Sequence, residues 1–335
     1  MLLQNGVNKG VGMKHEIVKS SAGYTVAARV IDDNWSDFDT QSFIDLIREY
    51  GVLFWKRSSC TTQQWVDFQL KVGYAQINDM WCTDPEFPTL YRVTNKPLSD
   101  SMEGLFSHGE LDWHCNILFT PDSEEVVGLR GVTIIPGSQT ICANSLPYWT
   151  TLDKQTQQLY KTLFIQYTNQ MPDTYENKLA HYMLPSKEAE DFQRERINTR
   201  IESCVNWDDS AQYPSARFSK TGALRLVPNH PLGMQGIYFP HLNMSSILDS
   251  NKLPRADHQS IYEAIKRDYI DSNQFHYAHD WEEGDILMME QLTGVHRRNN
   301  VWEEQALDPT QHLRELQRSC WWYKSEWRQH FDRIL

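Results

Sequence analysis

From about residue 88 onward, short β-prone runs alternate with turn signals, and this pattern restricts the fold more than any other feature of the sequence. The runs are Leu90–Thr94, Gly131–Ile135, Leu224–Val227, Gly236–Phe239, Asp285–Met289 and Cys320–Tyr323. Turn signals such as Pro136-Gly137 and Glu283-Gly284 separate them. Many short strands with such punctuation favour a sandwich, a jelly roll or a barrel. We therefore predict a mainly β fold with flanking helices, of the α+β class.

The N-terminal part predicts a helix, a strand and a second helix. Residues Thr40–Gly51 have the periodicity of an amphipathic helix, with a glycine suited to end it. The run Val52–Trp55 predicts a short buried strand, and Thr61–Gly73 has a threonine start and a glycine stop typical of a helix. Residues 1–15 are aperiodic and are expected to be flexible.

Two polar, helix-prone stretches interrupt the β-rich part. The first is predicted as an insertion over residues 150–215, and the second is Asp257–Tyr269. Insertions in such a fold often form the mouth of a pocket, although a pair of helices that only braces the scaffold is an equal alternative. We expect residues 1–335 to form one domain.

Composition excludes several classes of protein. The 335-residue chain has 32 Lys and Arg against 44 Asp and Glu, a formal net charge of −12, and its longest basic cluster is Arg297–Arg298. A nucleic-acid partner is therefore not expected, because such proteins present a basic patch or stripe. The sequence lacks a long apolar run and an N-terminal apolar signal segment, so we expect no membrane span and a cytoplasmic location. The six cysteines form no C-x-x-C pair and are expected to be free thiols.

Four polar residues alternate along one predicted strand. They are Glu110, Asp112, His114 and Asn116, and alternate residues of a strand share a face. Downstream, His296 follows an apolar strand and a loop. Two histidines and one oxygen ligand form the facial triad of non-haem iron, which leaves open positions for a chelating cosubstrate and O2.

Five motifs then follow one another in a recognisable order. They are Trp113-His114-Cys115-Asn116, Gly137 to Asn144 with Thr140, Asn229-His230-Pro231, Trp281 to His296 with Gly284-Asp285, and Arg314 to Arg318. In this order the chain resembles the taurine dioxygenase-like (TauD/TfdA) family of Fe(II)- and 2-oxoglutarate-dependent oxygenases, over about residues 16–324. Each motif is weak alone, but five in sequence are specific.

The resemblance implies a double-stranded β-helix, the jelly roll of clavaminate synthase-like proteins, with the 150–215 insertion covering the active site. It implies that His114, Asn116 and His296 hold Fe(II), and that O2 and 2-oxoglutarate are consumed. The cosubstrate is a dianion, and a fixed guanidinium suits the carboxylate that does not chelate the metal.

By the same resemblance, Thr140, Arg314 and Arg318 contact 2-oxoglutarate; Arg318 has the alternative of an anionic substrate group. We take Asp112, Glu110 and Asn144 as candidate substrate contacts, with no catalytic residue beyond the metal centre. Among the other histidines, surface positions are expected for His108, His276 and His279, with the entrance of the site as the alternative position. His230 is expected to brace a turn.

The implied reaction oxidises an unactivated C–H bond of a small molecule, with succinate and CO2 as co-products. Hydroxylation is the default outcome, and desaturation, cyclisation and halogenation stay open. The rival hypothesis is a non-catalytic or metal-impaired relative that binds a small molecule or a protein. A homo-oligomer is compatible with either hypothesis.

The family's carboxylate ligand is replaced here by Asn116. A neutral amide oxygen binds Fe(II) more weakly and leaves the site one charge more positive. Four interpretations stay open. Asn116 coordinates the metal; water or an anion takes the position, as in related halogenases; Asp112 or Glu110 supplies the carboxylate; or iron is not used or the asparagine was introduced by engineering.

Overall fold

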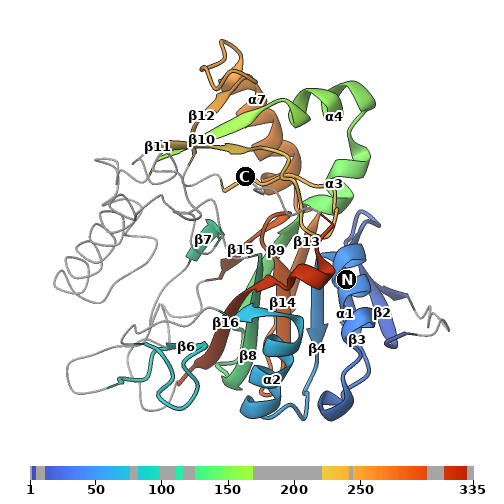
Figure 1. Ribbon diagram of the computed structural model, residues 1–335, viewed down its shortest axis with the longest axis vertical. Helices are drawn as coiled ribbons and strands as arrows, with labels where there is room; N and C mark the ends of the chain where they lie inside the picture. The colour runs from blue at the N-terminus through green and yellow to red at the C-terminus, as the bar shows by residue number, and fades with distance from the viewer. Residues whose placement is uncertain are drawn as a thin grey trace.

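The computed structural model describes residues 2–4, 12–75, 82–98, 111–115, 125–168, 221–240, 244–299 and 313–329. Within these segments, most of the regular structure is β-strand, arranged in three sheets (Figure 1). No helix in these segments combines the length and the apolar character needed to cross a bilayer.

The largest sheet has nine strands. In spatial order they are β1 (Leu2–Gln4), β2 (His15–Lys19), β3 (Thr25–Val30), β4 (Val52–Trp55), β14 (Ile286–Glu290), β8 (Val126–Thr133), β16 (Glu315–Tyr323) and β5 (Gly73–Ala75), and β6 (Leu90–Thr94) also pairs with β16. Neighbouring strands are antiparallel except for the parallel pair β3–β4. The sheet thus joins the N-terminal strands to strands from the far end of the chain.

A four-stranded antiparallel sheet faces the large one. Its order is β13 (His276–Asp280), β9 (Gln139–Asn144), β15 (Gly294–Arg298) and β7 (Leu111–His114). The two sheets share one hydrophobic cluster, and the rings of Phe54 on β4 and Tyr277 on β13 stack across it with centroids 4.9 Å apart. Two largely antiparallel sheets packed face to face form the architecture expected of a jelly roll.

Successive side chains of β14 point to opposite faces of the large sheet and pack into two different hydrophobic cores. Ile286 and Met288 belong to the core that the N-terminal helices cover, whereas Leu287 and Met289 belong to the cluster between the sheets. All four are buried, which requires an unbroken apolar run of the kind that a strand buried on both faces shows.

The N-terminal helices form where their sequence signals place them. Helix α1 (Thr40–Tyr50) starts at Asp39, whose side chain accepts from Ser42 N, and ends at Gly51 with φ 68°. Helix α2 (Thr62–Val72) begins with a capping box, in which Thr61 and Gln64 satisfy each other's backbone N–H groups. Such a cap contributes about 1 kcal/mol to helix stability.

The remaining helices lie on both sides of the fold. They are η1 (Trp35–Asp37), α3 (Ser145–Thr151), α4 (Lys154–Lys161), α7 (His258–Ile265), η4 (Lys266–Asp271) and η5 (Ser325–Trp327). Helices η1 and η5 pack with α1 and α2 on the core of the large sheet, and the others lie near the smaller sheets. A three-stranded sheet, β11 (Thr221–Arg225), β10 (Phe164–Thr168) and β12 (Met244–Leu248), lies beside α3, α4 and α7 (Figure 1). Residues 169–220 lie outside the described part, so the cover that the 150–215 insertion would provide stays a prediction.

One predicted strand is wrong. The run Gly236–Phe239 is not a strand in the structure; instead Tyr238 N donates to Leu226 O at 2.8 Å and Ile237 N donates to the Ser145 hydroxyl at 2.9 Å. The apolar side chains of this run are buried. Burial alone does not require a partner strand, so an apolar run does not by itself predict a strand.

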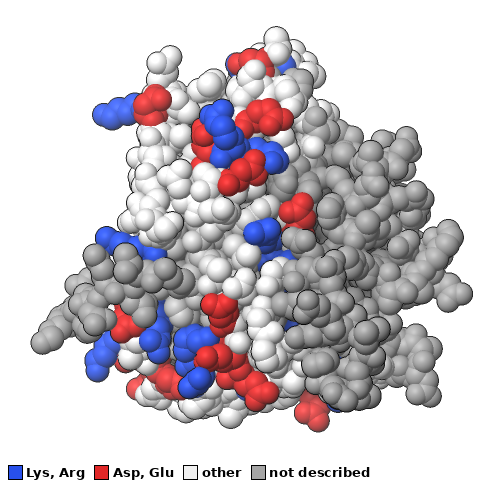
Figure 2. Space-filling view, turned by 180° about the vertical axis from the view of Figure 1, so that it is seen from behind, with Lys and Arg blue, Asp and Glu red and all other residues white. Residues whose placement is uncertain are grey.

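The cysteines that the structure describes are buried free thiols, as expected; they are Cys60, Cys82, Cys115, Cys142 and Cys320. Figure 2 shows Lys and Arg interspersed with Asp and Glu among the described residues on one face. The cytoplasmic location and the exclusion of nucleic acid stay predictions.

Candidate active site

His114 and His296 lie directly opposite each other on neighbouring strands. The register pairs His114 of β7 with His296 of β15, and their ring centroids are 4.3 Å apart at an interplanar angle of 52°. Each side chain is 8 % exposed. The sequence places these residues far apart, and the antiparallel pairing of β7 with β15 brings them together.

Both imidazoles are neutral in this environment. Burial lowers the pKa of His114 to about 4, and the Arg318 and Arg298 charges act in the same direction. Burial also holds the pKa of His296 well below its usual range, with His114 and Arg318 adding to the shift. A neutral imidazole is the form that ligates a metal ion.

Hydrogen bonding also orients His114 as a metal ligand would be oriented. Its Nδ1 lies 2.6 Å from the backbone oxygen of Asp112, so Nδ1 carries the proton and Nε2 keeps a lone pair. Metal-binding histidines commonly donate their second ring N–H to a carbonyl or carboxylate in this way. The pair therefore fits a metal ion, with His114 and His296 as two of its ligands.

The other residues of the predicted ligand strand are only partly described. Asn116 and Glu110 lie outside the described residues. Asp112 is half-buried, and its carboxylate accepts from the adjacent Trp113 N at 2.7 Å. Across the described segments, His, Cys, Asp and Glu side chains form no cluster of three that could hold a metal ion. Asp112 thus does not complete a triad with the two histidines there.

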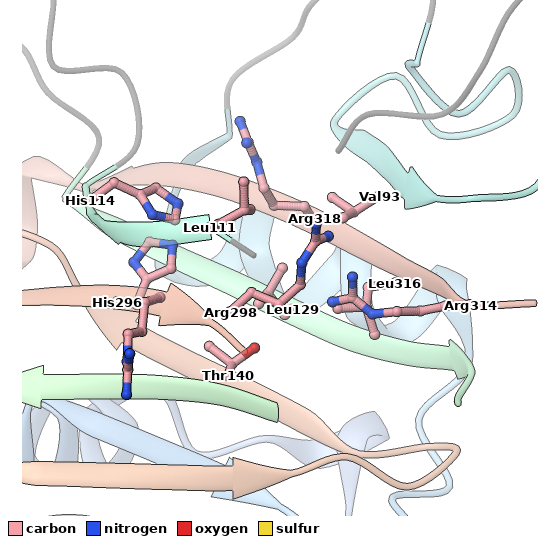
Figure 3. A pocket seen from close by; sticks show the side chains of 11 residues that line it. Val93, Leu111, His114, Leu129, Thr140, His296, Arg298, Arg314, Leu316 and Arg318 are labelled. Atoms are coloured by element: carbon pink, nitrogen blue, oxygen red, sulfur yellow. The ribbon is translucent and has the colours of Figure 1, made fainter. Parts of the chain in front are cut away.

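The histidine pair opens into a pocket with about 390 Å³ of empty space, part of it open to solvent (Figure 3). Val93, Leu129 and Leu316 contribute from the large sheet, and Leu111 and Thr140 from the small one. Four arginines also line it; they are Arg297, Arg298, Arg314 and Arg318. The described lining contains no Asp or Glu, so its formal charge is strongly positive and suits an anionic ligand.

Arg314 is fixed at the start of β16. Its backbone oxygen accepts from the Thr94 hydroxyl at 2.7 Å, and its backbone N–H donates to Asn95 Oδ1 at 2.7 Å. The side chain is 3 % exposed, and burial lowers its pKa to about 10. Arg318 follows on the same strand face, 4.7 Å from the Tyr91 ring centroid. Arg314 and Arg318 both line the pocket, and their roles stay predictions.

The Thr140 hydroxyl is oriented by Trp281. The indole Nε1 donates to Thr140 Oγ1 at 3.0 Å, and both residues are buried. Because the hydroxyl oxygen accepts this bond, its own hydrogen is available for a ligand in the pocket. Trp281 in turn packs edge-on against His279, with ring centroids 4.5 Å apart.

His279 is buried, so its predicted surface position is wrong. Its Nδ1 lies 2.8 Å from the Tyr277 hydroxyl, and its Nε2 lies 3.1 Å from Asp285 Oδ2. Asp285 is fully buried, and it also accepts from the Arg57 N–H at 2.8 Å. Asp285 and His279 therefore tie the Gly284 turn to β13, next to Trp281. His276 is half-buried rather than exposed, and His108 lies outside the described residues.

Two other predicted residues, Asn144 and His230, make hydrogen bonds to the backbone and are not part of the described pocket lining. The Asn144 amide donates to Tyr50 O at 2.6 Å and to Val26 O at 3.2 Å, and its oxygen accepts from Leu146 N at 3.0 Å. These contacts start helix α3 and lie away from the pocket lining. His230 accepts from Leu232 N at 3.0 Å and so braces a turn, as expected.

Arg298 is one of several pocket residues, Arg297 among them, that the sequence interpretation did not take as site residues. It lies two residues after His296 on β15, opposite Thr140 of β9, and is 3 % exposed. Burial and the neighbouring Arg314 charge hold its pKa well below its usual range. Strand alternation was the available signal, since residues two apart share a face.

Residues 19–320 match the sequence family described as "Taurine catabolism dioxygenase TauD, TfdA family". The chain belongs to this family. Among solved structures, a taurine dioxygenase from Burkholderia xenovorans is similar at TM-score 0.60 and 15% identity, covering 92% of this chain and 90% of that one. AAD-2 in complex with Mn(II) and N-oxalylglycine is similar at TM-score 0.60 and 15% identity, covering 93% and 99%. The comparison with curated proteins found no match.

Family membership confirms the mainly β jelly-roll fold. Enzymes of the TauD/TfdA family are oxidoreductases that use Fe(II), 2-oxoglutarate and O2. The chain is accordingly a 2-oxoglutarate-dependent dioxygenase. The roles of individual residues, the substrate and the outcome of the reaction are separate questions.

Proposed function

We propose that this oxygenase oxidises an unactivated C–H bond of a small molecule, with hydroxylation as the default outcome and succinate and CO2 as co-products. One observation carries the proposal. The ring centroids of His114 and His296 are 4.3 Å apart, in the same pocket that Arg314 and Thr140 line. Neutral metal ligands and an anion-binding end thereby lie in one cavity.

In this proposal, His114 and His296 hold Fe(II) together with Asn116. When bound, the iron would activate O2 and supply the oxidising power for cosubstrate decarboxylation and C–H oxidation. Arg314 binds the distal carboxylate of 2-oxoglutarate through its planar donor fork, and Thr140 adds a hydroxyl donor. Arg318 serves either the same dianion or an anionic group of the substrate.

The remaining pocket residues shape the reaction by excluding water. Val93, Leu111, Leu129 and Leu316 supply apolar walls around the charged groups. A site with less water strengthens charge–charge attraction and prevents side reactions. Concave sites that are apolar with a few placed polar groups suit small-molecule substrates.

Asn116 gives the first test. Under anaerobic conditions, Fe(II) and 2-oxoglutarate should produce the weak visible charge-transfer band of the chelate. An anionic ligand binds Fe(II) more strongly than an amide, so Asn116→Asp should tighten Fe(II) binding about tenfold or more, a gain of about 1.4 kcal/mol.

Succinate formation and product identity complete this test. Tighter iron binding with an unchanged product would show that Asn116 only weakens the site, and a changed product would show that it steers the chemistry. A wild-type protein with no band and no succinate from any substrate would contradict the proposal and favour a binding protein. Arg267→Ala is a suitable control, because that side chain is exposed and does not line the pocket.

A further inference from the structure

His230 and Glu290 form a fully buried pair beside the turn that joins β14 to β15. His230 Nε2 lies 2.8 Å from Glu290 Oε1, and neither side chain is exposed. His230 Nδ1 accepts from Leu232 N at 3.0 Å, so the ring proton is on Nε2 and faces the carboxylate. Burying a charged group has a cost that apolar side chains avoid, and the other contacts of the pair show what it holds in place.

The second oxygen of Glu290 closes the β14–β15 turn, residues 291–293. Glu290 Oε2 accepts from Leu292 N at 2.7 Å, from Thr293 N at 3.0 Å and from the Thr293 hydroxyl at 3.2 Å. One carboxylate thus connects the imidazole to the backbone of the turn. Strand β15 starts directly after the turn and carries His296.

The same turn also contacts the end of β7, the strand that carries His114. Cys115 directly follows His114, and its Sγ lies 3.4 Å from Gly294 O and 3.7 Å from Gln291 O. Figure 3 shows the rings of His114 and His296 facing each other, with centroids 4.3 Å apart. The turn therefore touches both of the strands that bring the two imidazoles together.

The chain that follows His230 packs against the turn at a second point. A Cβ added at Gly236 would lie 2.5 Å from Ser145 Oγ and 3.0 Å from Thr293 Cβ, so the backbone of this segment lies directly against the turn. Ser145 Oγ donates to Thr293 O at 2.7 Å, and Ile237 N donates to Ser145 Oγ at 2.9 Å. One segment thus supports the turn through an imidazole at one end and through close backbone packing at the other.

We propose that His230 and Glu290 are positioning residues for the metal site, because they fix the β14–β15 turn and thereby the spacing and orientation of His114 and His296. This inference rests on the proposed function, in which these two histidines hold the metal. Neither His230 nor Glu290 belongs to the described pocket lining, so their effect on metal binding is indirect. Loss of a group that orients metal ligands typically lowers metal affinity about 10- to 100-fold, and we expect the lower end of this range for a pair that acts through a turn.

Calorimetric titration with Mn(II) tests the inference without turnover. His230→Leu keeps the space filled but leaves Glu290 without the imidazole N–H, so it should weaken Mn(II) binding about tenfold. His230→Gln keeps an N–H donor near the position of Nε2, and it should bind Mn(II) within about threefold of the wild type. Recovery by the glutamine variant would show that the contact with Glu290, and not the ring itself, supports the site.

Co(II) in place of Mn(II) adds a spectroscopic readout, because the visible bands of Co(II) depend on how its ligands are arranged. The bands should shift in His230→Leu and return to the wild-type position in His230→Gln. Ile44→Ala is the control for general destabilisation, since Ile44 is fully buried on α1 in the core that the N-terminal helices cover. It should lower stability in urea unfolding but leave the Mn(II) affinity and the Co(II) bands unchanged.

Each outcome decides between the hypotheses. Weaker Mn(II) binding and shifted bands in His230→Leu, with recovery in His230→Gln and no change in Ile44→Ala, support the inference. Unchanged Mn(II) binding in His230→Leu overturns it while the proposed function stands, and so does an equal loss in Ile44→Ala or a His230→Gln variant as weak as His230→Leu. A wild-type protein that binds no Mn(II), or whose Mn(II) affinity survives His114→Ala and His296→Ala, contradicts the proposed function itself.

Discussion

Replacing Trp281 by phenylalanine tests whether the Thr140 hydroxyl is held in place for the cosubstrate. The Trp281 Nε1 hydrogen bond to Thr140 is 3.0 Å long and buried. Phenylalanine keeps an aromatic ring against His279 but removes the N–H donor. The hydroxyl would then be free to rotate, and its own hydrogen would no longer be directed to a ligand.

The structure sets the size of the expected effect. Leaving a buried acceptor without its donor costs about 1–3 kcal/mol. The smaller ring leaves part of the Trp281 volume unfilled, which adds about 1 kcal/mol. We therefore expect Trp281→Phe to lower the free energy of unfolding by about 2–4 kcal/mol. Loss of hydroxyl orientation should also weaken 2-oxoglutarate binding about three- to tenfold.

A double-mutant cycle separates this effect from general destabilisation. Urea unfolding gives the stability, and calorimetric titration of 2-oxoglutarate with Mn(II) gives the affinity. Thr140→Val removes the hydroxyl at nearly constant size. If Trp281 acts through Thr140, Trp281→Phe should weaken binding less than about twofold in the Thr140→Val background. Losses that simply add in the double variant would refute the reasoning.

Two further predictions concern stability. Burial raises the pKa of Glu125 to about 7, so the folded protein keeps a proton that the unfolded chain releases above about pH 4.5, and stability falls as the pH rises from about 4.5 through 7. Glu125→Gln removes this loss, so its free energy of unfolding relative to wild type should increase by up to about 3 kcal/mol across that range; a difference that does not vary with pH would contradict the shift. Gly51 has φ 68°, and an added Cβ would lie 3.1 Å from Leu146 Cδ1. Gly51→Ala should cost about 1–2 kcal/mol or more in urea unfolding, and it should cost more than Gly23→Ala, which shares the positive φ but has open space; equal costs would show that the Leu146 contact is unimportant.

Local sequence signals predicted the elements whose determinants are close in the chain. Helices α1 and α2 follow from Gly51 and from the reciprocal capping of Thr61 and Gln64. Strand β6 has the predicted bounds Leu90–Thr94. The predicted strand Gly236–Phe239 failed because an apolar run reports burial, and its side chains pack without strand pairing.

Motif order supplied the long-range information that local patterns lack, and the roles it assigns to the pocket residues stay predictions. His114, His296, Thr140, Arg314 and Arg318 all line one pocket, although no local pattern states that their strands meet.

The environment of a side chain was the part that sequence could not supply. His279 is buried, with its Nδ1 2.8 Å from the Tyr277 hydroxyl on the same strand and its Nε2 3.1 Å from Asp285 on the next turn. The contact with Asp285 depends on how the turn folds back onto the strand, and no local pattern shows it. Asn144 bonds the backbone of Val26 and Tyr50, which are distant in sequence.

A crystal structure with Mn(II) and N-oxalylglycine tests the central claim most directly. The anomalous signal of the metal should lie within coordination distance of the ring nitrogens of His114 and His296, with the distal carboxylate of the ligand on Arg314. A metal bound elsewhere, or a ligand whose distal carboxylate faces solvent, would contradict the account.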